Sequence, residues 1–235
     1  MLPDNSQARK MAERSLTDGK PEVRASAAAA LGAMQSKASI AKLRAATDDK
    51  DPSVALAAAH ALIQLNDNSG YEVYYDILTG KRKPKGLLAS QAEILNDRKK
   101  RAELGINEAL GYVPFAGIGW EAYKAIHKND SSPVRATAAK VLTKDLDPDT
   151  TKALADALGD NSWAVRAAAL QALATRGDPS ALDDVELYMS DDKDAVKYTA
   201  AAAVLRLSAI RESGTSTKQH KRNKRRASPK RKSDG

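Results

Sequence analysis

The chain lacks cysteine and has few aromatic residues, with one Phe, two Trp and seven Tyr among its 235 residues. Without cysteine it can form no disulfide, no thiolate metal site and no cysteine nucleophile. No segment reaches the roughly 18 consecutive apolar residues of a transmembrane helix, so we expect no integral membrane association. The N-terminus lacks the charged and apolar regions of a signal peptide. The histidines His60, His127 and His220 are scattered, and we expect neither a metal nor another cofactor.

Alanine supplies much of the apolar fraction of 42%. A core with so few large side chains cannot fill one thick globule, so we expect thin layers of closely approaching helices. The charge is uneven along the chain. Residues 211–235 hold ten Lys or Arg and two acidic residues, which equals the net charge of +8 of the whole sequence. Residues 81–101 form a second basic stretch, with eight Lys or Arg against Glu93 and Asp97.

A repeat of 31 residues runs through most of the chain. Valines recur at this spacing, an acidic or amide residue precedes each of them by five positions, and an alanine-rich stretch follows. Arginine comes directly after three of the valines. The pattern predicts units of two helices joined by a turn, which bury their apolar faces only by stacking. The repeated positions are Val23, Val54, Val134, Val165 and Val196, with Asp18, Asp49, Asn129, Asp160 and Asp191 before them and Arg24, Arg135 and Arg166 after them.

The repeated aspartate and arginine have a structural explanation. The aspartate stands at the N-terminal end of the second helix, where it can cap the helix and interact favourably with its dipole. The arginine can bridge to an aspartate of the neighbouring unit. Because both positions follow the period of the fold, we predict a ladder of ion pairs between layers rather than a binding site.

The spacing Asp-x-x-x-x-Val-Arg-x-x-Ala-x-x-x-Leu, best matched at 160–173, 18–31 and 129–142, resembles HEAT-like repeats of the short class named after phycobilisome lyase subunits. The resemblance implies an all-α, right-handed α-solenoid of about six helical hairpins, with protein binding as the usual function. We expect repeats near 5–34, 36–65, 70–95, 117–143, 147–175 and 178–210, and an irregular insertion near 96–116. The similar iron-binding deoxyhypusine hydroxylases carry repeated His-Glu pairs, and this sequence has none.

The repeat breaks between Val54 and Val134, which are 80 residues apart. One degenerate unit plus an insertion of 18 residues accounts for this length. We favour a buried plug between the two halves of the array for the aromatic residues of the insertion, and an exposed loop that binds a partner or touches a membrane is the alternative. Because aromatic and basic residues gather only here, this region is our candidate site for a protein or anionic partner. Its residues are Tyr71, Tyr74, Tyr75, Lys81, Arg82, Lys83, Lys85, Arg98, Lys99, Lys100, Arg101, Tyr112, Phe115 and Trp120.

The segment 211–235 has almost no apolar residues, so we expect a disordered basic tail. It resembles a bipartite nuclear-import signal or a nucleic-acid-binding arm, and a solubilising tail is the alternative. No aromatic residue lies between its cations, so the sequence does not support base stacking. The candidate polyanion-binding residues are Lys221, Arg222, Lys224, Arg225, Arg226, Lys230, Arg231 and Lys232.

No phosphate-binding glycine loop and no nucleophile elbow frames a catalytic residue, so we expect that the protein is not an enzyme. The leading hypothesis is a protein–protein interaction scaffold with a helical-repeat surface. One alternative is binding of nucleic acid or another polyanion through the tail and the basic stretch 81–101. Another is a lyase-like or chaperone-like accessory subunit. We expect a monomer in the cytoplasm, or in the nucleus if the host is eukaryotic.

Overall fold

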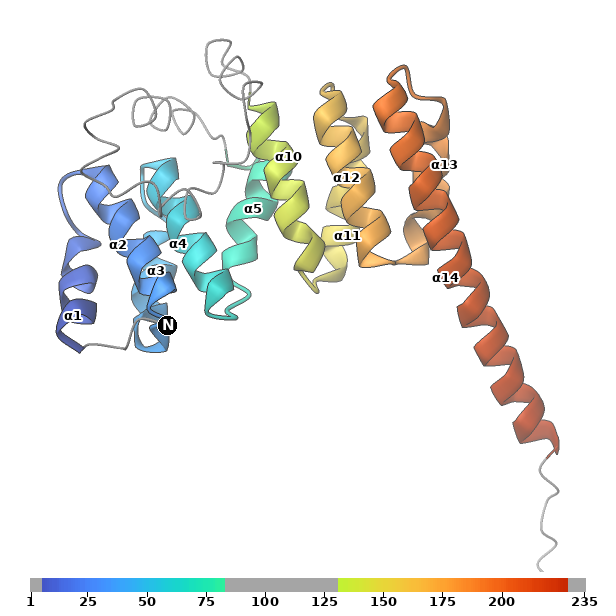
Figure 1. Cartoon of the computed structure of the whole chain (residues 1–235), viewed down its shortest axis with the longest axis horizontal. Helices are drawn as coiled ribbons and strands as arrows, with labels where there is room; N and C mark the ends of the chain where they lie inside the picture. Colours follow the sequence, from blue (N-terminus) through green and yellow to red (C-terminus); the bar gives the residue numbers. More distant parts are fainter. Residues whose placement is uncertain (1–5, 83–130, 228–235) are drawn as a thin grey trace, which may run out of the picture.

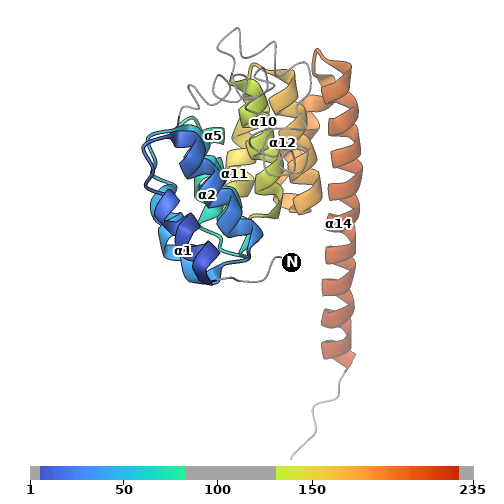
Figure 2. The same ribbon diagram turned by 60° about the vertical axis from the view of Figure 1, so that its left-hand side comes forward.

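The computed structural model describes residues 6–82 and 131–227, with side chains up to residue 214. The described residues form an α-solenoid whose helices stand side by side in one row (Figure 1), and a view turned by 60° shows α14 at one end of the stack (Figure 2). The layers are α1 (Ser6–Ser15) with α2 (Pro21–Ala33), α3 (Ile40–Ala46) with α4 (Pro52–Gln64), α5 (Gly70–Leu78) with α10 (Ser132–Val141), α11 (Pro148–Asp156) with α12 (Trp163–Arg176), and α13 (Leu182–Glu186) with α14 (Asp194–Ala227).

Aspartate and glycine mark several helix ends. The Asp147 carboxylate accepts a hydrogen bond from the N–H of Asp149 at 2.9 Å, and Asp178 accepts one from Ser180 at 3.0 Å. A proline follows each of these aspartates, at a position where a missing N–H removes no helical hydrogen bond. Gly177 ends α12 with a φ of 71°, a left-handed conformation that glycine adopts without steric cost. Aspartate before proline thus marks the start of a helix here, and glycine marks an end.

Small residues let the second helices of neighbouring layers approach closely. A Cβ added to Gly32 of α2 would lie 2.8 Å from the Cβ of Ala61 in α4, which is closer than real Cβ contacts. Ala27 and Ala28 are also buried in α2. The alanine-rich composition is thus explained by the short separation between stacked helices.

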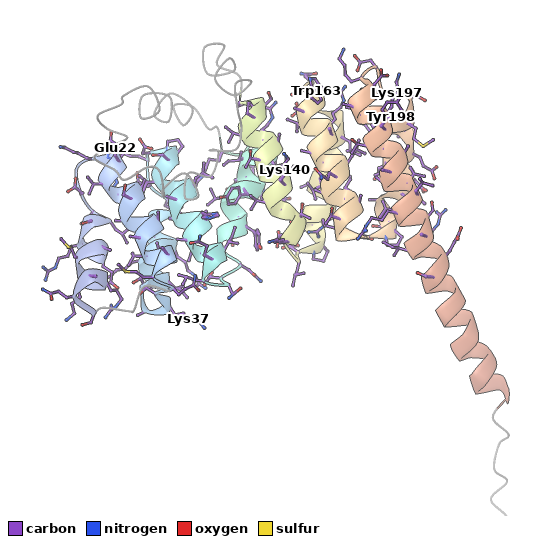
Figure 3. All side chains as sticks on the ribbon, viewed as in Figure 1. Glu22, Lys37, Lys140, Trp163, Lys197 and Tyr198 are labelled. Carbon is purple, nitrogen blue, oxygen red and sulfur yellow. The ribbon has the colours of Figure 1, made fainter. Side chains whose placement is uncertain are left out.

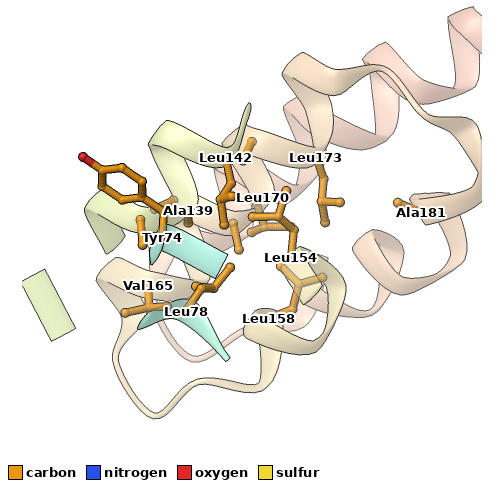
Figure 4. Packing of buried hydrophobic residues seen from close by; sticks show 14 of the residues in the cluster. Tyr74, Leu78, Ala139, Leu142, Leu154, Leu158, Val165, Leu170, Leu173 and Ala181 are labelled. Carbon is orange, nitrogen blue, oxygen red and sulfur yellow. The ribbon is translucent and has the colours of Figure 1, made fainter. Parts of the chain in front are cut away.

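The buried apolar side chains form two clusters. The smaller lies in the first two layers around Leu31, Leu43 and Leu62, and the larger extends from α4 to α14. Tyr74 is the largest fully buried side chain of the described residues. Figure 4 shows Tyr74 to one side of the labelled leucines of the larger cluster, with its hydroxyl directed away from them.

Helix α5 packs directly on α10, although residues 79–131 separate them in sequence. Tyr74 of α5 and Val134 of α10 belong to the same buried cluster. Helices α5 and α10 are therefore arranged like the first and second helices of one layer. The second helix expected for the third unit and the first helix expected for the fourth lie in 83–130, outside the described residues. The division into six units stays a prediction.

Helix α14 extends well past the stack. Among its described side chains, which reach residue 214, Leu207 is the last that is buried, and the backbone stays helical to Ala227. The structure thus differs from our expectation of disorder from residue 211 onwards, because 211–227 continue the helix. A helix that is already nucleated grows readily through Lys, Arg, Gln and Ala. No helix within the described ranges is both long and apolar enough to cross a bilayer.

Candidate partner-binding site

The predicted ladder of ion pairs is confirmed at three interfaces between layers. In each rung an arginine of one second helix donates two hydrogen bonds to the aspartate that precedes the second helix of the following layer. This two-bond geometry fixes the orientation of both groups as well as their separation. The rungs are Arg24–Asp49 at 2.7 and 2.8 Å, Arg135–Asp160 at 2.9 and 3.0 Å, and Arg166–Asp191 at 2.8 and 2.8 Å.

Each rung also orders the turn beside it. Nη1 of Arg166 donates to the carbonyl oxygen of Asp160 at 3.1 Å, and Asp191 accepts from the N–H of Lys193 at 2.9 Å. Lys193 precedes the first residue of α14, so the aspartate fixes the turn and does not cap the helix as we expected. The hydrogen bonds from Arg166 lower the pKa of Asp191 to about 2.

The ladder is interrupted between the second and third layers. Ala55 stands at the arginine position, and Gly80 stands 25 residues later, at the spacing that separates arginine from aspartate in the other rungs, so these two positions form no rung. Arg82 takes over the contact from the other side. Its Nη1 donates to the carbonyl oxygen of Thr47 at 2.7 Å, and its Nη2 lies 3.8 Å from the carboxylate of Asp48. We therefore assign Arg82 to holding these two turns together, rather than to the partner contact we predicted.

The three tyrosines of α5 differ in their accessibility. Tyr74 is 1% exposed, so our prediction of a partner contact is wrong for this residue, which belongs to the core. Tyr71 and Tyr75 are half-buried and pack against the same cluster with part of each ring accessible. Burial, with a smaller contribution from Asp145, raises the pKa of Tyr71. The structure therefore leaves two of the three aromatic residues available to a partner.

Lys81 stands beside these rings. Its ammonium nitrogen lies 5.1 Å from the centroid of the Tyr75 ring, within the range of a cation–π interaction, and the side chain is exposed. Tyr71, Tyr75 and Lys81 form what we call the α5 patch. The predicted residues Lys83, Lys85, Arg98, Lys99, Lys100, Arg101, Tyr112, Phe115 and Trp120 lie outside the described residues, as do Lys230, Arg231 and Lys232 of the tail.

The tail residues from Lys221 to Arg226 lie on the helical extension of α14, and their side chains are outside the described ones. Elsewhere, no group of three or more His, Asp or Glu side chains that could hold a metal ion is found within the described ranges. His60 lies 3.3 Å from Gln64 on the same helix, and burial lowers its pKa. This agrees with a packing role for His60.

One exposed surface was missed by the sequence reasoning. Tyr198 and Leu205 of α14 are both 74% exposed. At the same two positions of the repeat α12 has Ala167 and Ala174. In α4 the same two positions hold Leu56 and Ile63, which are buried and half-buried, so the residue types alone did not show that Tyr198 and Leu205 would be exposed.

Comparison with known proteins gives the family of the repeat. The sequence model of a family described as HEAT repeats matches residues 8–93 and 121–206. A structure of human deoxyhypusine hydroxylase in complex with glycerol is 21% identical with a TM-score of 0.32, covering 87% of this chain and 75% of that one. The complex of CpcE and CpcF of phycocyanin lyase from Nostoc sp. PCC7120 is also 21% identical, with a TM-score of 0.34, covering 89% and 83%. A search of curated proteins found no match.

Proposed function

Because the chain belongs to the HEAT-repeat family, in which stacked helical hairpins build an extended surface, we propose that it is a non-catalytic scaffold that binds a protein partner. The contact lies at the α5 patch. The observation that carries this proposal is the exposed Lys81 over the partly accessible ring of Tyr75, at the one layer boundary of the described residues where the arginine and aspartate of a rung are both replaced.

The chemistry of the patch suits an acidic segment of a partner. Aromatic side chains are enriched in the centre of protein interfaces because they bury a large area with little loss of side-chain entropy. The Lys81 ammonium, held beside the Tyr75 ring, offers a charge to a carboxylate. We therefore expect the partner to present a carboxylate next to an apolar or aromatic side chain.

The surroundings hold the patch in place before a partner arrives. Buried Tyr74 anchors α5 in the core, and Arg82 ties the end of α5 to the preceding turn through Thr47. A rigid patch loses little conformational freedom on binding, which favours affinity.

The test is affinity capture from an extract of the native host with the immobilised full-length chain, at low and at moderate salt. The key variant is Lys81→Glu, which reverses one exposed charge of the patch. Lys37→Glu is the matched control, because Lys37 is also exposed and lies in the turn between α2 and α3. Circular dichroism of each variant verifies that the fold is intact.

We expect the same protein to be recovered by the wild type and by Lys37→Glu at both salt concentrations, and to be depleted with Lys81→Glu. Equal recovery by all three chains would place the contact elsewhere and refute the assignment to the α5 patch. Recovery of no protein by any of them would refute the scaffold function itself.

A second candidate function is polyanion binding, which the charge distribution favours. Residues 218–232 contain nine Lys or Arg. Such a segment neutralises several phosphates and binds in a manner that weakens steeply with salt. Replacing these nine residues by Gln should abolish recovery of nucleic acid in the same capture while leaving the protein partner unaffected. Nucleic acid that is retained by this variant would exclude the tail as its binding site.

A further inference from the structure

The last helix of the array has an exposed apolar face. Tyr198 and Leu205 of α14 are each 74% exposed, and both belong to one row of exposed residues along the helix. The spacing of this row alternates between three and four residues, which is the spacing of a seam between two packed helices. We call this row the α14 seam, and its members are Ala195, Tyr198, Ala202, Leu205 and Ala209.

In earlier layers, the face of the second helix that corresponds to the α14 seam packs on the following layer. Leu205 occupies the same position of the repeat as Gly32, which faces α4 of the second layer, and as Ala174. The carbonyl oxygen of Ala174 accepts a hydrogen bond from Arg206 of the following layer at 2.7 Å. In the described residues no further layer covers this face of α14. The array therefore ends on a stacking surface that carries two large apolar side chains.

The opposite end of the array is polar. Helix α1 has no buried residue, and its exposed side chains are those of Ser6, Gln7, Lys10, Met11 and Arg14. Arrays of this kind normally end in a layer with a polar outer face, which keeps them soluble. Figure 3 labels Tyr198 on α14, at the end of the stack away from Glu22 of α2. A head-to-tail stack of copies would pair an apolar end with a polar one, so the geometry favours contact between two α14 ends.

We propose that a second copy of this chain docks on the α14 seam, with the two α14 helices antiparallel about a two-fold axis. In this arrangement Tyr198 of each copy packs against Ala209 of the other, and Leu205 packs against Ala202. Large residues then meet small ones at these four positions of the seam. A parallel pair would place tyrosine on tyrosine and alanine on alanine, which packs less densely.

The charge of α14 also favours the antiparallel copy. Its first turn follows Asp191 and Asp192 and contains Asp194, all acidic. Residues 214–227, at the other end of the helix, contain six Lys or Arg and no acidic residue. The antiparallel register brings the basic end of one copy beside the acidic end of the other. This contact goes beyond the scaffold function and replaces our expectation of a monomer.

The first test is the mass of the full-length chain in solution, measured by sedimentation over a range of concentrations. We expect the mass to rise with concentration from 25.1 kDa towards twice that value, and to fall when salt is added. Leu205→Glu should weaken self-association by roughly tenfold or more, because it places a charge in the seam. Leu146→Glu is the matched control, since Leu146 is 85% exposed in the turn between α10 and α11. A mass of one chain at all concentrations, or equal effects of the two variants, would overturn the proposal.

The second test is the register, and the absence of cysteine from the sequence makes it direct. In the antiparallel pair the Ala202 positions of the two copies are neighbours, whereas the Ala195 positions lie on the order of 25 Å apart along the helix axis. A short thiol cross-linker should join two copies of Ala202→Cys but not of Ala195→Cys. Cross-linking of both variants would indicate a parallel pair, and cross-linking of neither would exclude the seam.

Discussion

The rung between Arg166 and Asp191 gives a prediction whose size follows from its burial. The side chains are 12% and 6% exposed, and both hydrogen bonds are 2.8 Å long. Arg166→Met keeps the aliphatic stem but removes all donors to the carboxylate. Asp191 is then left nearly buried with one remaining backbone donor, the N–H of Lys193. We expect a loss of about 2–4 kcal/mol in the free energy of unfolding, since an uncompensated buried charge dominates the cost.

The matched comparison is Arg135→Met. That rung has the same geometry, but its side chains are 23% and 15% exposed, so water can solvate the aspartate that is left behind. We expect a smaller loss, about 1–2 kcal/mol. Urea denaturation followed by circular dichroism measures both values, and hydrogen exchange of α13 and α14 shows whether the last layer opens first.

A double-mutant cycle isolates the pair itself. Asp191→Asn keeps an acceptor for the N–H of Lys193 while it removes the charge. Combined with Arg166→Met, it should show a coupling free energy of about 1–3 kcal/mol. A coupling near zero, or a larger loss for Arg135→Met than for Arg166→Met, would refute the claim that these rungs hold the layers together.

Three further predictions concern packing and pH. Gly32→Ala should lower the free energy of unfolding by about 1–3 kcal/mol in urea, because the new methyl group has no room beside Ala61, whereas Gly159→Ala should be nearly neutral because nothing lies within 4 Å of its added Cβ. Tyr74→Phe should leave the thermal midpoint unchanged or raise it, since the buried hydroxyl has no hydrogen-bond partner in the described residues; a clear fall would reveal a partner. The pKa of Asp191 is lowered to about 2, so its ionised form stabilises the fold above the ordinary carboxyl range, and that contribution disappears as the pH falls towards 2. Stability curves from pH 5 to pH 2 should therefore be shallower for Asp191→Asn than for the wild type.

The regular parts of the array could be predicted because one period controls several properties at once. One unit illustrates this. Val165 is buried, Asp160 orders a turn and Arg166 forms a rung, and all three features are found in the structure. The helix starts at Asp147 and Asp178 are of the same predictable kind, because an aspartate before proline accepts a hydrogen bond from a free N–H group of the first turn.

The candidate site was predicted less well because its residues were selected by type alone. Tyrosine is equally suited to a core and to an interface, and Tyr74 proved to be buried while Tyr75 is partly accessible. Arg82 was grouped with the basic residues around it, although its contact with Thr47 replaces a missing rung. Its role depends on the absence of partners at positions 55 and 80, which becomes meaningful only when the layers are placed side by side.

The most direct measurement of the scaffold function is photo-cross-linking in cells of the native host. A benzophenone amino acid replaces Tyr75 in the full-length chain, and the same group at Tyr188, a half-buried tyrosine of the last layer, serves as the control. Our account predicts that irradiation joins position 75, and not position 188, to one protein of defined mass. Adducts from position 188 alone, or no protein adduct from position 75, would contradict it.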